Sequence, residues 1–555
     1  MKLSGAEIII RTLIEQGTDT VFGYPGGQIL HVYDSLYKHR SKIKHILTAH
    51  EQGAAHAADG YARATGKAGV VISTSGPGAT NLVTGIATAH LDSVPMVIIC
   101  GNVPTTQIST DSFQEIDITG ITLPITKHNY FVNSVESLAD TIREAFRLAV
   151  SGRPGPVLID VPKDVQIAKC EYTPSSPIEP IEKQSAKEIR IQQSADCINE
   201  AVRPFIYFGG GIISSDAKDE LLELAEKLDS PIGCSMMGLS AIPTDHPRFL
   251  GMQGMHGHYA CTTAMNDADV IIALGVRFND RSTGNRHKFA PRSKIIHIDI
   301  DGSELNKTVN SAISLRGDLK ETLIKLLPLI NKKSLPDWQK KIVSLKIEEE
   351  KLSDKREGLT PKNLISAINA RIGENTAVAT DVGQHQIWSA QNLVFKKSRR
   401  FLTSGGLGTM GFGLGAAIGA AFGTGERSVL ISGDGSFGMS LQELATAVTY
   451  NVPIVIVIMN NGVLGMVRQW QTLFFNKHYS NTTLDRKSDF VAIAKAFGAE
   501  GESVCDMQTL ESALDKAFSH NGPYIIDCKI DKDEFVLPML PPNGSFDEMI
   551  VKTGD

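Results

Sequence analysis

The amino-acid sequence predicts an α/β protein with three doubly wound parallel-sheet domains. A chain of 555 residues exceeds what one hydrophobic core accommodates, and ordinary domain sizes suggest about three or four units. Short apolar runs flanked by glycine or proline alternate with helical patterns, as in sheets covered by helices on both faces. Two segments rich in proline, serine or charge interrupt this alternation. Three α/β domains are the simplest account of these observations.

The first domain is predicted over residues 1–168. Its first residues, MKLSGAEIIIRTLIEQG, have the pattern of an amphipathic helix. Strands are expected at 69–73, 96–99 and 157–160, where apolar runs are bounded by glycine or proline. Residues 170–188 are rich in proline, serine and charge, and are predicted to form a linker.

The second domain is predicted over residues 189–335, with strands at 205–208, 270–274 and 295–300. From Asp337 the chain is strongly charged with helical spacing. This pattern predicts an exposed connecting helix between the second and third domains.

The third domain is predicted over residues 358–532, and a tail rich in proline and glycine follows at 533–555. Apolar runs at 429–431 and 454–459 are typical of buried parallel strands, and the apolar spacing over 441–448 predicts a helix between them. The three elements form a βαβ unit.

Composition and charge exclude several classes of protein. A 42% apolar and 21% charged composition is typical of a soluble globular protein, and a formal charge of −6 does not favour nucleic acid or an anionic membrane as a partner. The seven cysteines show neither CxxC nor Cys/His metal spacing, which favours reduced thiols. No apolar run approaches the length of a membrane span, and the first helix pattern contains charges, unlike a signal peptide. We therefore expect a cytoplasmic protein that binds neither nucleic acid nor membrane.

Polar residues follow both strands of the βαβ unit. Gly433–Ser436 reads GDGS and Asn460–Gly462 reads NNG. The carboxyl ends of parallel strands meet at one edge of a sheet, where ligands of open α/β sheets bind. An Asp carboxylate, an Asn amide oxygen and a backbone carbonyl suit Mg2+, which often keeps a phosphate as co-ligand. The site therefore requires a diphosphate.

The spacing of these two motifs resembles the thiamin diphosphate (ThDP) fingerprint. GDG is followed by the 24 residues 436–459 and then NN, with strand, helix and strand in order. A tight Gly-Asp-Gly turn without a ligand is the alternative.

Glu51 is the candidate for the buried acid that ThDP chemistry requires. It follows ILTAH and begins a helical pattern rich in alanine and glycine, so it is expected to be poorly solvated. In ThDP enzymes a carboxyl hydrogen-bonds to N1' of the aminopyrimidine, and the cofactor then acts as its own base. The alternative is an ordinary acid at a helix amino terminus, where it interacts with the dipole.

Across essentially its whole length the chain resembles the catalytic (large) subunit of the acetohydroxyacid synthase (acetolactate synthase) branch of ThDP enzymes. The resemblance is carried by FGYPGG from Phe22, HEQGAAHAADGYARATGK (50–67), SGPGATN (75–81), TDSFQE (110–115), DVPKDV (160–165), GMHG (254–257), GVRFNDRSTGN (275–285), DVGQHQ (381–386), GGLGTMGFGLGAA (405–417), GDGSF and GMVRQWQ (465–471). It implies that the three domains bind the ThDP pyrimidine, FAD and the ThDP diphosphate, respectively. It also implies a homodimer or homotetramer, because different chains hold the two ends of ThDP, and a regulatory small subunit.

The resemblance also implies roles for single residues. The Mg2+ ligands would be Asp434, Asn461 and the carbonyl of Val463. Further ThDP contacts are expected from Val382, Gln384, His385, Gly408, Met410, Gly433, Gly435, Ser436 and Met466. Met410 would hold the cofactor bent, and an ordinary core methionine is the alternative.

The catalytic residues implied are Glu51, Gln114, Lys163, Arg281 and Trp470. Arg281 would bind the carboxylate of the acceptor substrate with its planar fork, and a surface salt bridge is the alternative. Trp470 and Met255 would shape the acceptor pocket. Gln114, Lys163 and Phe113 would line its entrance.

FAD contacts are implied for the middle domain at Gly209, Gly210, Gly211, Met255, His256, Arg277, Asp299 and Asp318. The triple glycine alone is weak support, since it does not follow GxGxxG and is more often a turn. The flavin would be structural, because acetolactate formation has no net redox change. Asn279 replaces the more usual Asp of RFDDR, GHYACTTAM replaces GTVYAN, and Pro542-Asn543 also departs from the pattern.

The expected reaction decarboxylates pyruvate and joins the two-carbon unit to a second pyruvate or to 2-ketobutyrate, the first common step of branched-chain amino acid biosynthesis. Two other pyruvate-using ThDP enzymes, catabolic acetolactate synthase without FAD and pyruvate oxidase with it, remain as alternatives. A non-catalytic cofactor-binding paralogue is the alternative from another class. Glu51, Asp434 and Asn461 argue against it.

Overall fold

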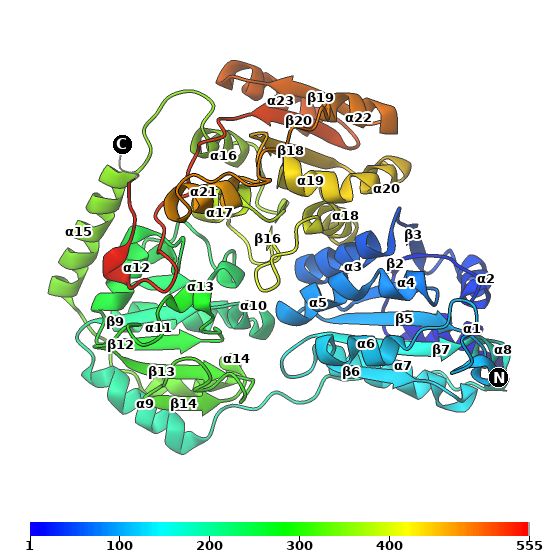
Figure 1. Cartoon of the computed structure of the whole chain (residues 1–555). Helices are drawn as coiled ribbons and strands as arrows, with labels where there is room; N and C mark the ends of the chain where they lie inside the picture. The colour runs from blue at the N-terminus through cyan, green and yellow to red at the C-terminus, as the bar shows by residue number, and fades with distance from the viewer. Residues whose placement is uncertain (553–555) are drawn as a thin grey trace.

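The computed structural model describes residues 1–552 and contains three six-stranded sheets in which every neighbouring pair of strands is parallel (Figure 1). Helices cover both faces of each sheet, so the strands are buried along most of their length. This confirms the predicted fold class of three α/β domains. The predicted strands are all present, with ends shifted by a few residues.

The first sheet has the order β3-β2-β4-β5-β7-β6. Its strands are β2 (Thr20–Tyr24), β3 (Lys44–Leu47), β4 (Gly69–Ser73), β5 (Met96–Asn102), β6 (His128–Phe131) and β7 (Pro156–Pro162). Its helices are α1 (Gly5–Glu15), α2 (Leu30–Lys38), α3 (Glu51–Thr65), α4 (Pro77–Thr80), α5 (Val83–Leu91), α6 (Ile118–Thr122), α7 (Val135–Val150) and α8 (Lys163–Ile167). A small antiparallel pair, β1 (Lys2–Ser4) with β8 (Lys169–Glu171), ties the start of this domain to its end.

The middle sheet has the order β11-β10-β9-β12-β13-β14. Its strands are β9 (Pro204–Phe208), β10 (Ile232–Cys234), β11 (Phe249–Met252), β12 (Val270–Leu274), β13 (Lys294–Asp299) and β14 (Ile313–Arg316). Its helices are α9 (Glu188–Glu200), α10 (Gly211–Ser215), α11 (Lys218–Leu228), α12 (Tyr259–Asp267), α13 (Asp280–Thr283) and α14 (Leu319–Leu326), and α15 (Pro336–Leu352) follows.

The third sheet has the order β16-β15-β17-β18-β20-β19. Its strands are β15 (Ala377–Thr380), β16 (Phe401–Leu402), β17 (Ser428–Gly433), β18 (Ile454–Asn460), β19 (Glu500–Val504) and β20 (Tyr524–Lys529). Its helices are α16 (Pro361–Asn369), α17 (Gln384–Asn392), α18 (Phe412–Thr424), α19 (Asp434–Ser440), α20 (Leu444–Thr449), α21 (Gly465–Phe474), α22 (Phe490–Phe497) and α23 (Met507–Ser519).

Helices α3 and α18 join the first domain to the third. They pack side by side and run in the same direction, because Gly415 lies on His56, Gly419 on Ala57 and Gly423 on Thr65 (Figure 1). Glycines on α18 let the two backbones approach closely. Both helices therefore begin at the same end of this joint, where Glu51 starts α3.

Two expected elements differ from the prediction. The predicted helix at 441–448 is interrupted, because α19 begins directly at Asp434 and a 3-10 turn at Leu441–Glu443 separates it from α20. The Gly-Asp-Gly segment, for which a tight turn was the alternative interpretation, is thus the first turn of a helix. The connecting helix exists as α15, but it is not simply exposed, since Trp338, Ile342 and Leu345 are buried. Lys and Glu at the intervening positions account for the charged pattern.

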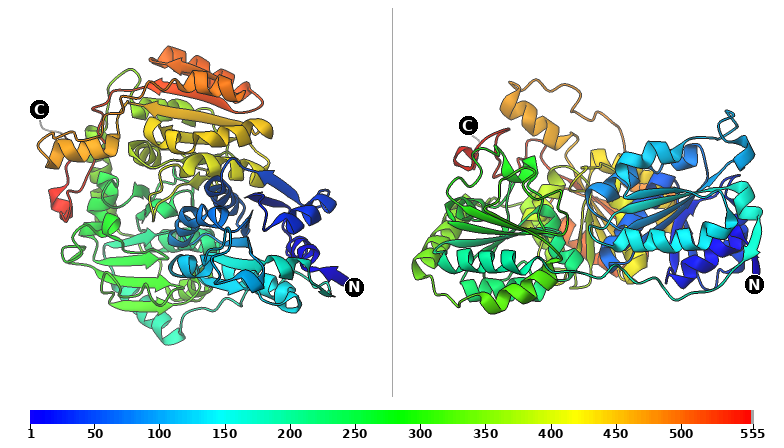
Figure 2. Two further views of the ribbon diagram at one scale, coloured as in Figure 1. Left: turned by 45° about the vertical axis from the view of Figure 1, so that its right-hand side comes forward. Right: turned by 90° about the horizontal axis from the view of Figure 1, so that it is seen from below.

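The first and middle domains both contact the third, which lies above them in Figure 1, and Figure 2 shows the same grouping from two other sides. The segment 172–187 between β8 and α9 has no regular structure. The tail after Asp531 returns to the middle domain, where the N–H of Leu540 donates to the carbonyl of Met255 (2.8 Å). Within residues 1–552 no helix is long and apolar enough to cross a membrane.

Candidate active site

The predicted metal ligands lie at adjacent strand ends of the third sheet. β17 and β18 pair in parallel with Gly433 opposite Met459, which places Asp434 and Asn461 side by side. Asp434 is 7% exposed, and burial raises the pKa of its carboxyl to about 6, against the opposing effect of nearby backbone N–H groups. Asn461 accepts from the N–H of Val463 (3.2 Å) and thereby fixes the turn after β18. A divalent cation would stabilise the charged carboxylate, so the oxygen donors present fit Mg2+.

Next to this strand edge lie the predicted diphosphate contacts. Gln384 donates to Gln469 (3.0 Å) and to the carbonyl of Glu534 (2.7 Å), and its own oxygen lies 3.4 Å from the Asn461 amide. His385 is 5% exposed, burial lowers its pKa to about 3, and its Nε2 has no hydrogen-bond partner in the structure. A buried ring nitrogen without a partner fits a polar group of a ligand.

The segment that carries Met410 borders this region. A β-carbon on Gly435 would lie 3.8 Å from Met410 Cε, and the Ser436 hydroxyl donates to the carbonyl of Val382 (2.8 Å). Met410 is only half-buried and lines a cavity. It is therefore not the ordinary core methionine of the alternative interpretation.

A cavity of about 1300 Å3 is formed by residues of all three domains. It brings together many of the predicted site residues. These are Val382, Gly408, Met410, Met466, Trp470, Arg281, Met255, His256, Arg277, Asp299, Asp318 and Gly209, Gly210 and Gly211. Arg63, Asp92 and Ser93 of the first domain also line it.

Arg281 and Trp470 contact each other on one wall of the cavity. The guanidinium lies 5.6 Å from the indole ring centre, and Nη1 lies 3.3 Å from the sulfur of Met255. The side chain of Arg281 is 59% exposed, and its pairing with Asp280 is long at 3.8 Å. Such a loosely paired cation can still bind a carboxylate. Asn279 caps α13 by accepting from the N–H of Ser282 (3.0 Å), so the departure from Asp keeps the cap.

The predicted flavin contacts line the same cavity. β-Carbons on Gly209 and Gly211 would collide with the backbone at Gly275 and Val276, so a packing reason for glycine exists at both positions. His256 Nδ1 is buried without a partner, and burial raises the pKa of Asp299 to about 6. Asp318 caps α14 by accepting from the N–H of Glu321 (3.2 Å). An unpaired buried ring nitrogen at a cavity fits a ligand with polar groups.

Glu51 lies elsewhere, at the start of α3. It is 9% exposed as predicted, and Asn81 Nδ2 donates to its Oε2 (2.9 Å). A β-carbon on Gly78 would lie 3.3 Å from Oε1, and one on Gly76 would lie 3.0 Å from Cα of Gln114. Glu51 and Gln114 therefore flank the same turn of the first domain.

Family models and curated proteins match the chain along its length. The N-terminal TPP binding domain, the central domain and the C-terminal TPP binding domain of thiamine pyrophosphate enzymes match residues 3–121, 191–326 and 381–528. The acetolactate synthase isozyme 2 large subunit of Escherichia coli is 44% identical, covering 99% of this chain and 100% of the relative.

A probable acetolactate synthase large subunit of Methanocaldococcus jannaschii is also 44% identical, over 99% of this chain and 95% of its own length. The acetolactate synthase large subunit of Haemophilus influenzae is 41% identical, over 99% and 98%. The chain belongs to the acetolactate synthase large-subunit family of thiamine pyrophosphate enzymes. The resemblance predicted from the motifs is confirmed, and ThDP is the cofactor that its two matched binding domains support.

The predicted site residues of this thiamine pyrophosphate enzyme fall into two separate groups. Glu51, Gln114 and Lys163 are not among the described residues that line the cavity. Lys163 is the first residue of α8, and Phe113 is 83% exposed at the surface of the first domain. The predicted metal ligands Asp434, Asn461 and Val463 are likewise not among the lining residues.

Several residues of this thiamine pyrophosphate enzyme were not predicted from the sequence. Asn81 binds Glu51, Gln469 binds Gln384, and Glu443 of the third domain accepts from the N–H of Ala49 (3.2 Å) beside Glu51. Burial raises the pKa of Glu443. Asn81 is the last residue of the motif SGPGATN, so the sequence did contain a pattern that could have identified it. No local pattern marks Glu443, because its contact spans two domains.

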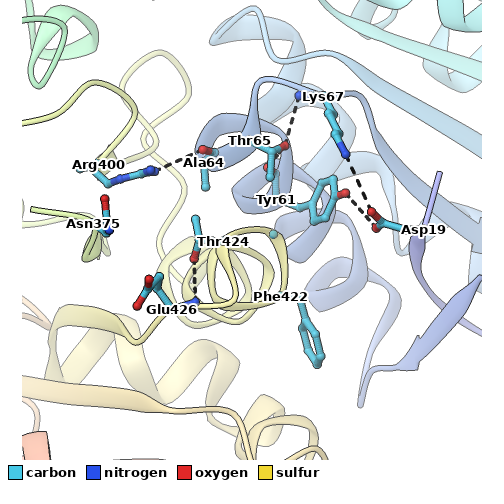
Figure 3. Close-up of a pocket in the computed structure, with 11 residues that line it drawn as sticks. Asp19, Tyr61, Ala64, Thr65, Lys67, Asn375, Arg400, Phe422, Thr424 and Glu426 are labelled. Atoms are coloured by element: carbon cyan, nitrogen blue, oxygen red, sulfur yellow. Dashed lines mark hydrogen bonds and ion pairs between the residues drawn. The ribbon is translucent and has the colours of Figure 1, made fainter. Parts of the chain in front are cut away.

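A second, polar cleft of about 410 Å3 lies away from these groups, where α3 and α18 end (Figure 3). Thr65 accepts from the N–H of Lys67 (3.1 Å), and Thr424 accepts in the same way from that of Glu426 (3.2 Å). Arg400 donates to the carbonyl of Ala64 across the domain boundary (3.2 Å). These bonds close the far end of the α3–α18 joint.

Proposed function

We propose that the chain is the catalytic subunit of an acetolactate synthase. It decarboxylates pyruvate and condenses the remaining two carbons with a second pyruvate or with 2-ketobutyrate. The products are 2-acetolactate or 2-aceto-2-hydroxybutyrate and CO2. The observation that carries the proposal is one cavity in which the Arg281–Trp470 pair lies with Met410 and Val382.

We infer distinct roles for the residues around this cavity. Bound ThDP supplies the electron sink for decarboxylation. Asp434, Asn461 and the Val463 carbonyl hold Mg2+, and the unpaired His385 Nε2 with Gln384 lies against the diphosphate. Val382 and Met410 set the position of the aminopyrimidine, with Gly408, Gly433, Gly435, Ser436 and Met466 beside it.

On the substrate side, Arg281 binds the carboxylate of the acceptor and Trp470 contacts its alkyl group. A guanidinium held against an indole is oriented for bidentate binding. FAD occupies the part of the cavity lined by Gly209–Gly211, His256, Arg277, Asp299 and Asp318. It acts as a structural group there.

The deciding experiment measures products. Purified protein with ThDP, Mg2+, FAD and pyruvate is expected to form acetolactate and CO2 without consuming oxygen. Oxygen uptake with acetate or acetyl phosphate as product would identify a pyruvate oxidase instead. Full activity after removal of the flavin would identify the catabolic, FAD-independent branch. Flavin and ThDP binding without turnover would identify a non-catalytic paralogue.

We further propose that the active site is completed by a second copy of this chain. Glu51, Gln114 and Lys163 do not line the chain's own cavity, whereas a β-carbon on Gly435, next to Asp434, would lie 3.8 Å from Cε of Met410 in the lining. In a symmetric dimer each partner can supply the group that the other lacks. Glu51 then contacts the pyrimidine bound to the partner's third domain.

Hybrid dimers test this arrangement. Glu51→Gln and Asp434→Ala, each inactive alone, are coexpressed with different tags and the hybrid is purified. If the two residues meet across the interface, one site carries both changes and the other none, so about half the activity returns. If they meet within one chain, both sites of the hybrid are damaged, and an inactive hybrid would refute the shared site.

A smaller regulatory chain is a further inferred partner. The relatives in Escherichia coli, Methanocaldococcus jannaschii and Haemophilus influenzae are named large subunits. Adding a candidate small subunit is expected to raise turnover and to form a complex on size exclusion. A cytoplasmic location stays a prediction, as do the domain boundaries given above.

A further inference from the structure

A short segment of the third domain forms one wall of the cavity. Residues 404–408 and Met410 line it, and Leu407 and Gly408 at the tip are exposed. Gly408 and Gly411 both have positive φ (70° and 90°). Such backbone is flexible unless other groups hold it. We call residues 404–411 the cofactor loop.

Within the third domain, hydrogen bonds hold both ends of the cofactor loop, and at its start Gln386 Nε2 donates to the carbonyl of Ser404 (3.1 Å). Asp381 accepts from the N–H of Gly411 (2.7 Å), and Ser404 accepts from the N–H of Thr409 (3.0 Å). These bonds fix the residue after Met410 and close the loop on itself. They leave the N–H groups of Gly405 and Gly406 to be paired by another part of the chain.

The first domain supplies that partner. Asp92, after α5, accepts from the N–H of Gly406 on Oδ1 (2.7 Å) and from that of Gly405 on Oδ2 (3.0 Å). Its side chain is fully buried. Thr88, on the same helix, shares a hydrogen bond with the hydroxyl of Thr409 (2.8 Å). A charged acceptor bound to two backbone N–H groups is stronger than a neutral one.

Arg63 fixes Asp92 in this position. It donates to Asp92 (2.9 Å), to the carbonyl of Thr403 just before the loop (2.9 Å), and to Asp59 (2.5 Å). Asp59 is also fully buried, but no hydrogen bond joins it to the loop in the structure. The guanidinium thus spans α3, the end of α5 and the third domain.

We propose that Asp92, held by Arg63, is a positioning residue for the cofactor loop. Through the loop it sets Gly408 and Met410 relative to α3, and so relative to the first domain that carries the pyrimidine-side acid. The loop lines the one cavity that is proposed to hold both ThDP and flavin, so its position also affects both cofactors. The catalytic consequence of this inference rests on the proposed function, whereas the positioning of the loop by Asp92 does not.

Two variants separate positioning from simple stability. Asp92→Asn keeps the size but lacks the charge and the second acceptor oxygen, so one loop N–H and one Arg63 bond are lost. Asp59→Asn is the matched control, because it removes a buried acid from the same arginine without touching the loop. Both are expected to lower the melting temperature.

The first measurement needs no cofactor. Hydrogen–deuterium exchange, followed by mass spectrometry of a peptide covering 404–411, is expected to speed up in Asp92→Asn and to match wild type in Asp59→Asn. Equal exchange of this peptide in the two variants, or in Asp92→Asn and wild type, would overturn the proposal. Should Asp92→Asn fail to fold, Thr88→Val removes the other first-domain bond to the loop and is expected to show the same selective exchange.

The second measurement concerns the chemistry. In Asp92→Asn the rate of ThDP C2 hydrogen exchange, read by NMR, is expected to fall about 10- to 100-fold, as for a misplacement near 1 Å. The flavin absorption band is expected to shift, and KM for pyruvate to change little. Altered loop exchange with unchanged C2 exchange would refute the catalytic consequence. A wild-type protein without C2 exchange would instead refute the proposed function.

Discussion

Replacing Gly419 by alanine is expected to force α18 away from α3. A β-carbon at this position would lie on the carbonyl oxygen and backbone of Ala57, closer than the 3.0 Å below which real β-carbons essentially never approach another heavy atom. These atoms belong to a helix and cannot rotate away. Overpacking of this kind costs up to about 3 kcal/mol. The better helix propensity of alanine offsets about 1 kcal/mol of this cost. The net loss is therefore about 2 kcal/mol.

Gly423→Ala provides the matched control on the same helix. Its β-carbon would meet side-chain atoms, the methyl group of Thr65 at 2.7 Å and the ring of Tyr61 at 3.1 Å. Side chains can move by a few tenths of an ångström, and the gain in helix propensity offsets much of that cost. This variant is expected to have nearly wild-type stability.

Thermal unfolding distinguishes the two variants. For a domain of 150–250 residues, about 2 kcal/mol lowers the melting temperature by roughly 4–8 °C. Several domains unfold here, so the transition compared is the one common to the first and third domains. Because Glu51 begins α3, Gly419→Ala is also expected to slow C2 exchange. Equal melting temperatures for Gly419→Ala and Gly423→Ala would refute the close backbone contact.

Four further outcomes are expected. Asp434→Ala should weaken ThDP binding at limiting Mg2+, and unchanged affinity would show that the strand end is not a metal site. Glu51→Gln should retain ThDP but lower C2 exchange by about 10²- to 10⁴-fold, and a wild-type rate would remove Glu51 from the site. Trp470→Leu should lower the preference for 2-ketobutyrate by about 10-fold or more, whereas Arg281→Lys should weaken both acceptors, as product ratios from mixed substrates will show. Burial raises the pKa of Asp160 to about 7 from its usual 3.8. The folded state therefore binds this proton more tightly than the unfolded state, and the wild type should lose stability as pH rises from 3.8 through 7. Asp160→Asn should flatten this dependence of melting temperature on pH.

Sequence patterns predicted those parts of the site that are formed within one domain by neighbouring strands and helices. The apolar runs before Asp434 and Asn461 form neighbouring parallel strands, so their spacing placed two oxygen donors together. The buried position of Glu51 also followed from its sequence context. By contrast, the helix that begins at Asp434 was missed, because glycines on both sides favour a turn by composition, and burial against the third domain's core overrides that preference.

Contacts between domains could not be derived from sequence patterns. The bonds of Asp92 to the cofactor loop and of Glu443 to the segment before α3 join residues more than 300 positions apart. Neither residue lies in a periodic or motif context that requires its charge. The pairing of Arg281 with Trp470 likewise came from family resemblance, since no spacing rule relates α13 to α21.

The first and third domains use one topology for complementary chemistry. Their strand orders are the same permutation, with β4 and β5 corresponding to β17 and β18. In each, an asparagine at the end of the fourth strand of that order binds an aspartate on the next: Asn102 donates to Asp160 (2.6 Å) and Asn460 to Asp527 (2.8 Å).

The two sheet edges differ in the segments beyond their strand ends. After β17 and β18 come the oxygen donors for a metal and diphosphate, whereas after β4 comes the turn that packs on the buried acid Glu51. In the proposed site, each edge supplies one half of what ThDP requires. The α3–α18 joint holds the two domains of one chain rigidly, with Glu51 outside the lining of the cavity. Because Glu51 lies outside the lining of its own chain's cavity, this arrangement supports the proposal that a second copy supplies the complementary edge.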